Sequence, residues 1–222
     1  MFDWNNVDTV LLDMDGTLLD LRFDNQFWLE QLPVAIARKN NISIEVAKTK
    51  ITSQYNAVKG TLDWYCIDYW SKQTGIDIRQ LKRSNAKNIS IRIDVIAFLI
   101  ALQERNIERV LLTNAHPDSL SLKMEQTGLD QHLDHLYSTH QFGHCKESLT
   151  LWQRLQAHHP FNPERTLFID DNEDLLLVAR QFGIRHVLGI KNPDSTKPMQ
   201  LFNDCLSIDD YGILTKQLTE IE

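Results

Sequence analysis

Short apolar runs alternate with longer amphipathic stretches along most of the chain, and this alternation limits the possible folds more than any other feature. The runs that we predict to be strands are 10–12, 109–113, 136–138, 166–170 and 185–188. Apolar residues at three- and four-residue spacing predict helices at 93–104, 119–127, 147–157 and 173–182. Strands that alternate with helices form parallel sheets, because a helix returns the chain to the start of the next strand. The sequence therefore predicts an α/β fold with a Rossmann-like, doubly wound parallel sheet.

Two carboxylates follow the first predicted strand. Asp13 comes directly after the apolar run 10–12, and Asp15 follows two positions later. Alternate residues of an extended segment point to the same side, and Gly16 allows the chain to turn so that both carboxylates can serve one reaction centre. Active sites of open α/β sheets lie at the carboxyl ends of strands. We therefore expect Asp13 to take part in chemistry.

Residues 21–90 interrupt the alternation. This segment is rich in aromatic residues, has a helical pattern, and contains no convincing strand between Phe23 and Ser90. Because it begins just after the two aspartates, it would lie over the mouth of the site. The predicted organisation is an α/β core domain of residues 1–20 and 91–222 with a helical cap domain at 21–90.

The composition narrows the function classes. The chain has 222 residues, of which 42% are hydrophobic and 24% charged, as expected for a globular enzyme. No apolar run reaches the ~20 residues of a membrane helix, and the first residues lack a basic, apolar signal segment. We therefore predict a cytoplasmic protein without a membrane partner. The formal charge of −7 disfavours nucleic acid as a partner, because that binding relies on clustered lysine and arginine.

Cysteine and histidine spacing predicts no further site. The three cysteines are too few and too far apart to indicate a disulfide framework or a zinc cluster. His140 and His144 are interpreted as loop residues, because no third ligand has the spacing of a zinc site. His116 and Pro117 are interpreted as the entry to a helix, although a role near the site stays open.

The DxDGT sequence at 13–17, directly after a hydrophobic strand, resembles the first motif of the haloacid dehalogenase superfamily. Phosphatases of this superfamily attack phosphate with an aspartate. Three further motifs follow in the expected order, at 111–114, at Lys146 and at 167–174. An isolated Asp-Gly pair is commonly only a turn, but the succession of four motifs favours an enzyme. The resemblance implies an α/β core with an inserted helical cap, in agreement with the alternation.

The resemblance assigns different roles to the two aspartates. It implies that Asp13 is the nucleophile, which forms an aspartyl-phosphate, and that Asp15 is the acid and base, which protonates the leaving alcohol and later activates water. Thr17 would fix the turn. Dehalogenases of the superfamily typically lack the second aspartate, since they have no alkoxide to protonate. Asp15 therefore favours a phosphatase.

The second and third motifs are expected to bind phosphate. By resemblance, the Thr113 hydroxyl and the Asn114 backbone N–H donate to phosphate oxygens, and Lys146 holds the charges of nucleophile and phosphate together. Taken alone, each has an ordinary alternative. Thr113 and Asn114 could simply end a strand and begin a turn, and most lysines are solvated surface charges.

The fourth motif is expected to complete a magnesium site. Mg²⁺ prefers hard oxygen ligands and keeps several waters, so two or three protein oxygens are enough. By resemblance these are a carboxylate oxygen of Asp13, the backbone carbonyl of Asp15 and the carboxylate of Asp171, and Asp170 could join through water. Leu175 stands where the commonest family pattern has an acid or asparagine, so no further ligand is assigned.

The resemblance extends over nearly the whole chain to the bacterial purine nucleotidases that act on GMP and IMP. The runs that carry it are 9–28, 62–71, 111–117, 165–174 and 188–195. It implies a magnesium-dependent phosphomonoesterase that hydrolyses purine nucleoside 5′-monophosphates to nucleoside and phosphate. The implied partner is therefore a small-molecule nucleotide.

The predicted cap is the part that would select the leaving group. Its aromatic residues at helical spacing are more often core than a binding surface, but a stacked base is worth about 1–3 kcal/mol. Phe23 follows the catalytic turn and Trp64 lies in an aromatic run, so these two are the first candidates for contact with a purine.

Two other functions stay open. One is a phosphatase of the same superfamily with another small substrate, such as phosphoglycolate or a sugar phosphate. The other is a noncatalytic nucleotide-binding protein, which would leave one set of residues unexplained: Asp13, Asp15, Thr113, Lys146 and Asp171. A panel of phosphomonoesters separates the first from a nucleotidase, and magnesium-dependent release of phosphate decides the second.

Overall fold

A six-stranded parallel sheet forms the centre of the computed structural model, which describes residues 3–220. The predicted core also includes 1–2 and 221–222, which lie outside the described residues. The strand order is β3-β2-β1-β4-β5-β6. The strands are β1 (Thr9–Leu12), β2 (Glu108–Thr113), β3 (His135–Ser138), β4 (Thr166–Asp170), β5 (His186–Ile190) and β6 (Ser207–Ile208). The predicted α/β fold with a doubly wound parallel sheet is confirmed.

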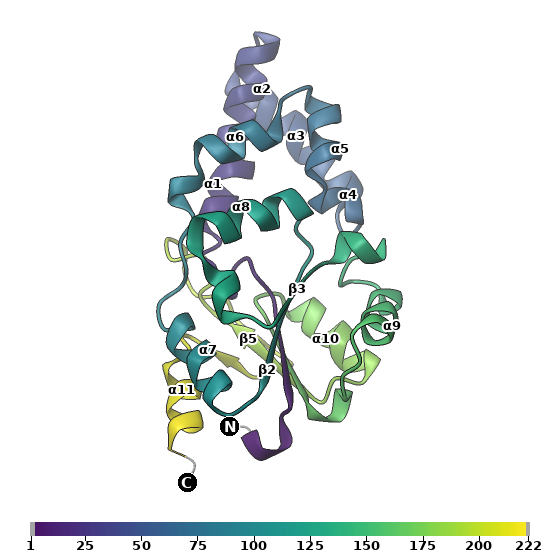
Figure 1. Ribbon diagram of the computed structural model, residues 1–222. Coiled ribbons are helices and arrows are strands. Elements are labelled where there is room, and N and C mark those ends of the chain that lie inside the picture. Colours follow the sequence, from purple (N-terminus) through teal and green to yellow (C-terminus); the bar gives the residue numbers. More distant parts are fainter. Residues whose placement is uncertain (1–2, 221–222) are drawn as a thin grey trace.

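Helices cover both faces of the sheet (Figure 1). One face packs against α7 (Val95–Glu104), α8 (Pro117–Thr127) and α11 (Gly212–Thr219), and the other against α9 (Leu149–His158) and α10 (Glu173–Phe182). In β1, Val10 and Leu12 belong to the first of these apolar clusters, whereas Leu11 belongs to the second. Because both faces are covered, the strand is buried at every position, and its residues after Thr9 are all apolar.

The elements near the C-terminus were not predicted. β6 has two residues, too few for a periodic pattern, and α11 begins at Gly212 without a side-chain cap. Tyr211, just before this helix, is buried and donates its hydroxyl hydrogen to the Thr17 carbonyl at 3.1 Å. The last helix therefore supports the loop that follows β1.

The helix α8 begins two residues earlier than predicted. His116 Nδ1 accepts a hydrogen bond from the Asp118 backbone N–H at 3.2 Å, and Pro117 occupies the first turn, where its missing N–H has no cost. The interpretation of His116 and Pro117 as a helix entry is confirmed.

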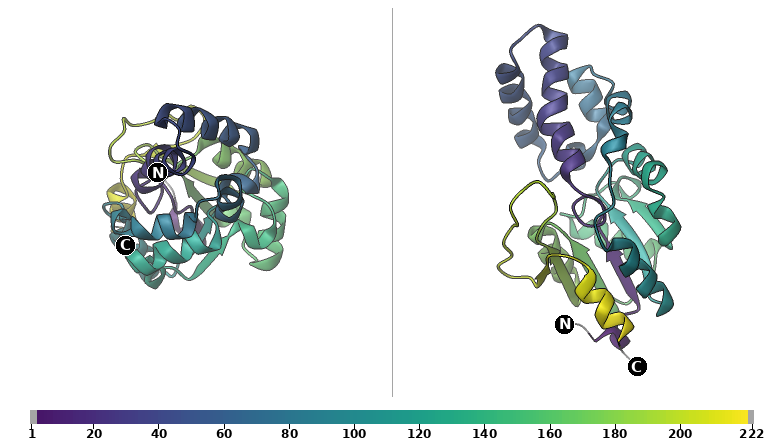
Figure 2. Two further views of the ribbon diagram at one scale, coloured as in Figure 1. Left: turned by 90° about the horizontal axis from the view of Figure 1, so that it is seen from above. Right: turned by 90° about the vertical axis from the view of Figure 1, so that its left-hand side faces the viewer.

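Residues 21–90, which we call the cap segment, contain a succession of helices. These are α1 (Arg22–Gln26), the π-helical turn η2 (Phe27–Gln31), α2 (Leu32–Asn40), α3 (Ile44–Val58), α4 (Leu62–Tyr65), α5 (Ile67–Thr74), α6 (Ile78–Ser84) and the 3₁₀ turn η3 (Ala86–Asn88). They enclose an apolar cluster of their own, which includes Phe27, Ile51 and Trp70. Figures 1 and 2 show most of these helices as a separate layer beyond the carboxyl ends of the strands.

No helix between residues 3 and 220 combines the length and the apolar character that crossing a bilayer requires.

Candidate active site

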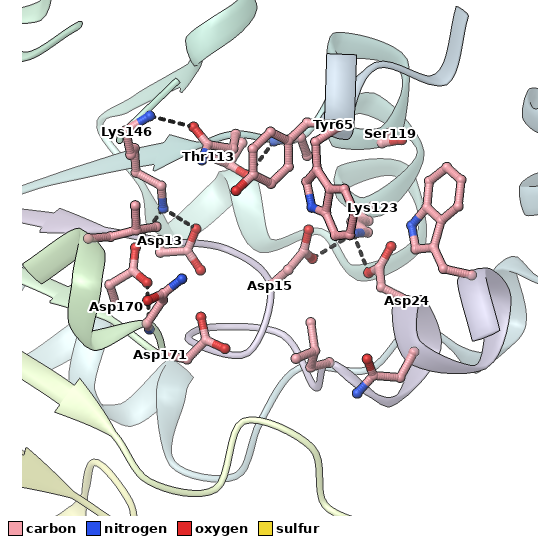
Figure 3. Close-up of a pocket in the computed structure, with 18 of the residues that line it drawn as sticks. Asp13, Asp15, Asp24, Tyr65, Thr113, Ser119, Lys123, Lys146, Asp170 and Asp171 are labelled. Carbon is pink, nitrogen blue, oxygen red and sulfur yellow. Dashed lines mark hydrogen bonds and ion pairs between the residues drawn. The ribbon is translucent and has the colours of Figure 1, made fainter. Parts of the chain in front are cut away.

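The ends of three neighbouring strands, with the loops that follow them, bring polar side chains together at the carboxyl edge of the sheet (Figure 3). Because β1 lies between β2 and β4, Asp13, Thr113 and Asp170 meet there. They line a cavity of about 350 Å³ whose opposite wall comes from the cap segment. Sheets of this kind bind ligands at this edge, and small-molecule sites have volumes of roughly 300–1,000 Å³.

Lys146 is a buried cation between two carboxylates. Its Nζ donates to Asp13 Oδ1 and to Asp170 Oδ2, both at 2.6 Å, and the residue is 1% exposed. Burial alone would lower the pKa of Lys146, but the two carboxylates outweigh it and raise the pKa, so the side chain stays charged. Burial raises the pKa of Asp13, and Lys146 opposes that change.

Three carboxylates lie around this single ammonium. Asp13, Asp170 and Asp171 each offer an oxygen, all within 4.8 Å of one another. Asp13 Oδ2 is buried and has no hydrogen-bond partner among residues 3–220. Burial, with the charges of Asp170 and Asp13, raises the pKa of Asp171 well above its ordinary value. The surplus of negative oxygens fits a hard divalent cation such as Mg²⁺.

Gly16 carries the chain past this acidic cluster. Its φ of +92° lies in the region that glycine favours, and a Cβ there would be 2.6 Å from Asp171 Oδ2 and 2.9 Å from Pro193 Cβ. Only glycine at position 16 therefore allows the turn after Asp15 to approach Asp171 this closely.

A second buried lysine holds Asp15. Lys123 Nζ donates to Asp15 Oδ1 and to Asp24 Oδ2, both at 2.6 Å, and Lys82 Nζ donates to Asp24 Oδ1 at 2.7 Å. Lys123 belongs to α8, whereas Asp24 and Lys82 belong to the cap segment. Burial raises the pKa of Asp15 to about 6, with Lys123 opposing the change. A carboxyl with this pKa can both give and take a proton near neutral pH.

We did not predict roles for Lys123, Asp24 and Lys82 from the sequence. They come from separate helices and share no motif, so their meeting depends on tertiary packing. The one trace in the sequence is a lysine among apolar residues in the run LSLKM at 120–124, and this pattern is too common to single out.

Two polar residues at the carboxyl end of β2 have different tasks. Thr113 Oγ1 accepts from the Ala115 backbone N–H at 3.0 Å, which leaves the hydroxyl hydrogen available to a ligand. The Asn114 side-chain oxygen accepts from the Lys146 backbone N–H at 2.9 Å, and its Nδ2 donates to Glu147 Oε2 at 3.1 Å. The side chain of Asn114 therefore positions the lysine loop.

Aromatic side chains form the cap side of the cavity, and Trp28 and Trp64 are among them. Phe23, in contrast, is 2% exposed and is not among the lining residues. Its ring lies in the core cluster, 5.4 Å from Lys82 Nζ and 5.8 Å from Lys123 Nζ. Of the two residues expected to contact a purine, the structure brings Trp64 to the cavity and leaves Phe23 beneath the two lysines.

Comparisons with known proteins agree with this geometry. A family model described as a haloacid dehalogenase-like hydrolase matches residues 7–183. The chain belongs to the haloacid dehalogenase-like hydrolases. Over 215 residues it is 48% identical to the GMP/IMP nucleotidase YrfG of Escherichia coli (strain K12) and to that of Shigella flexneri, with 97% of each chain covered. The predicted family resemblance is confirmed, and the chain is an enzyme of the hydrolase class.

Solved structures of haloacid dehalogenase-like proteins share the fold. A HAD phosphatase from Thermococcus onnurineus is 20% identical with a TM-score of 0.81, and the match covers 96% of this chain and 98% of that one. An L-2-haloacid dehalogenase from Xanthobacter autotrophicus is 15% identical with a TM-score of 0.63, covering 97% and 100%. Because the fold is shared by enzymes with different names, it does not select the substrate.

The close approach of Gly16 to Asp171 predicts a large effect of Gly16→Ala on stability. Alanine at this positive φ costs about 1–2 kcal/mol, and the overlap with Asp171 adds about 1–3 kcal/mol. Gly60→Ala is the matched control, because Gly60 has a φ of +77° with no atom near the added Cβ. Urea denaturation measures both variants. Equal losses of unfolding free energy would contradict the steric argument.

Proposed function

We propose that this hydrolase is a magnesium-dependent phosphatase that acts on purine nucleoside 5′-monophosphates, with GMP and IMP as its first substrates. The observation that carries the proposal is the placement of Asp13 and Asp15 at one cavity, each bound by its own buried lysine. The 48% identity to proteins named GMP/IMP nucleotidase supports the choice of substrate.

In the first step, Asp13 attacks the phosphorus and the bond from phosphorus to the 5′ oxygen breaks. Lys146 holds Asp13 Oδ1, so the orientation of the carboxylate is fixed and Oδ2 is the oxygen that attacks. Asp15 gives its proton to the departing 5′ oxygen. The nucleoside leaves, and Asp13 carries the phosphoryl group.

In the second step, Asp15 is a carboxylate and accepts a proton from water while the water oxygen attacks the phosphorus. The bond from phosphorus to Asp13 breaks, inorganic phosphate leaves, and Asp15 is protonated again. The Thr113 hydroxyl, the Asn114 backbone N–H and the Lys146 ammonium stabilise the phosphoryl oxygens in both steps.

The residues that would hold Mg²⁺ are Asp13 and Asp171, through their carboxylates, and Asp15, through its backbone carbonyl. When bound, the ion neutralises negative charge on the phosphate and on the surplus carboxylates. Asp170 is already held by Lys146 at 2.6 Å and by the Asn172 backbone N–H at 2.8 Å, so we assign it to positioning the lysine.

The nucleophile is tested with purified protein by phosphate release from GMP, IMP, CMP, phosphoglycolate and p-nitrophenyl phosphate. Asp13→Asn should abolish turnover, because an amide cannot form the phosphoryl intermediate, and it should leave the fold intact. Chelation should stop the wild-type reaction and Mg²⁺ should restore it. Asp13→Asn activity above about a tenth of wild type would rule out Asp13 as the nucleophile. If the wild-type enzyme hydrolyses phosphoglycolate in preference to GMP and IMP, the assignment of a nucleotide substrate is wrong.

The contact between Lys123 and Asp15 predicts a change in pH dependence. The ammonium favours the carboxylate form of Asp15, so Lys123→Met should raise the pKa of Asp15. Since Asp15 must be protonated for the first step, the alkaline limb of kcat/KM should move to higher pH, by roughly 1–3 pH units. Lys82→Met is the matched control, because it removes the outer cation but keeps the Lys123 contact. An unmoved limb in Lys123→Met would exclude Asp15 as the acid.

The position of Trp64 on the cavity predicts a loss of purine selectivity in Trp64→Ala. The loss of a stacked base should lower kcat/KM for GMP about 5- to 150-fold, the equivalent of about 1–3 kcal/mol. Turnover of p-nitrophenyl phosphate should change little. Tyr69→Ala, which alters a cap aromatic away from the cavity lining, controls for weaker packing. If Trp64→Ala reduces both substrates equally and lowers the melting temperature, Trp64 is cap core.

A further inference from the structure

A cluster of one thiol and two imidazoles joins the cap segment to the core. Cys66 lies between α4 and α5, His116 precedes α8, and His140 lies in the 3₁₀ turn η5 (Thr139–Phe142) after β3. Their ligand atoms are all within 4.8 Å of one another. None of the three lines the cavity, although their neighbours Tyr65 and Ala115 do. The cluster, which we call the thiol-imidazole cluster, is therefore separate from the acidic site and lies behind its wall.

His140 has a buried nitrogen that lacks a partner. Its Nε2 makes no hydrogen bond within the described part of the chain, while the ring has a hydrogen bond to the backbone of Asn114. Burial, together with His116, lowers the pKa of His140 to about 4, so the ring is neutral and keeps a lone pair at neutral pH. A buried acceptor without a partner is rare and calls for an explanation, such as an ion.

Cys66 and His116 both occupy helix N-caps. Cys66 Sγ accepts from the Tyr69 backbone N–H at 3.4 Å, and His116 Nδ1 accepts from the Asp118 backbone N–H at 3.2 Å. Serine, threonine, asparagine and aspartate are the residues that cap helices best. Capping alone therefore does not explain why a thiol and an imidazole stand at these positions.

We propose that the thiol-imidazole cluster is a second metal site, which takes Zn²⁺ or a similar thiolate-binding ion and so links the cap segment to the core. Zn²⁺ binds cysteine sulfur and histidine nitrogen in tetrahedral sites, and three protein ligands with one water are sufficient. Mg²⁺ prefers oxygen ligands and dehydrates reluctantly. Zn²⁺ should therefore bind at the thiol-imidazole cluster, and Mg²⁺ should bind at the acidic site.

Binding requires proton movements that the structure can accommodate. His116 Nδ1 accepts an N–H, so the ring proton is on Nε2, which lies 3.5 Å from Asp68 Oδ2. Coordination through Nε2 displaces this contact with Asp68 and moves the proton to Nδ1. The hydrogen bond from the Asp118 backbone N–H to Nδ1 is then lost, and the ring must turn so that Nδ1 donates instead to the Asp118 carboxylate, which now lies 3.8 Å away. A carboxylate behind a metal-bound histidine is a common arrangement. Cys66 binds as a thiolate, so each bound ion releases one proton to solvent.

The ion would act as a clamp on the cap segment. The existing contacts between cap and core near the cluster are polar. They include the hydrogen bond from the Tyr65 hydroxyl to Glu147 Oε1 at 2.7 Å, the ion pair of Arg79 with Asp118, and the approach of Asp68 Oδ2 to His116 Nε2 at 3.5 Å. Nucleotide entry and nucleoside release require the cap to move. Bound Zn²⁺ should therefore slow turnover, a consequence that rests on the proposed function, whereas binding itself does not.

Titration calorimetry with Zn²⁺ in excess Mg²⁺, which fills the acidic site, tests the proposal without a substrate. Two buffers of different ionisation enthalpy measure the released proton, and Co²⁺ reports the sulfur ligand through its thiolate charge-transfer absorption. Cys66→Ser and His116→Asn keep a capping oxygen, so both should fold as stably as wild type without metal. Each should weaken Zn²⁺ binding by roughly 10- to 100-fold or more. The matched control is Cys205→Ser, because Cys205 lies in the apolar cluster between the sheet and helices α9 and α10. This variant should bind Zn²⁺ normally.

Wild-type affinity for Zn²⁺ no greater than that of Cys66→Ser, or a Co²⁺ complex without the thiolate band, would overturn the site. For the clamp, Zn²⁺ should lower kcat with GMP in wild type and have little effect on Cys66→Ser. Equal inhibition of both proteins would mean that the ion acts at the acidic cluster, and the clamp would then be wrong. Absence of turnover in wild type would contradict the proposed function and leave the binding result standing.

Discussion

One buried ammonium holds together the carboxyl ends of the two central strands. Asp13 follows β1 and Asp170 ends β4, and their like charges would repel without Lys146 between them at 2.6 Å from each. Removing one partner of a buried ion pair leaves an uncompensated charge and is strongly destabilising. Lys146 balances only part of the local charge, since Asp171 adds a third carboxylate. The same arrangement that fixes the strand ends therefore also creates the demand for a divalent ion.

The second lysine gives the two aspartates of one motif different environments. Lys146 binds Asp13 entirely within the core, whereas Lys123 divides its charge between Asp15 and Asp24 of the cap segment. Burial is the main cause that raises the pKa of Asp15; the charge of Lys123 lowers it, and the charge of Asp24 raises it further. A cap displaced from the core would take Asp24 away, so Lys123 would favour the ionised form of Asp15. The protonated form that a general acid needs therefore belongs to the closed arrangement.

The sequence was sufficient for strands β1 to β5 and for the residues at their carboxyl ends, because alternation and order along the chain determine both. It was insufficient wherever side chains from unrelated elements meet. Lys123 lies in the middle of α8, and no local pattern indicates that it reaches Asp15. The aromatic pattern of the cap could not separate Trp64, at the cavity, from Phe23, in the core, because both are apolar at helical spacing. The strand β6 was missed since two residues carry no period.

The position of β1 in the middle of the sheet has a consequence for synthesis of the chain. Leu11 is paired with Val110 on one side and with Phe168 on the other, so its neighbours are made much later than the strand itself. The apolar cluster of the cap segment, in contrast, uses residues between Phe27 and Leu81, all of which leave the ribosome before β2. Domains generally fold as units during synthesis, and unpaired strands are prone to aggregation. We expect the helices of the cap segment to form first. Strand β1 should stay unpaired until β2 and β4 have been synthesised.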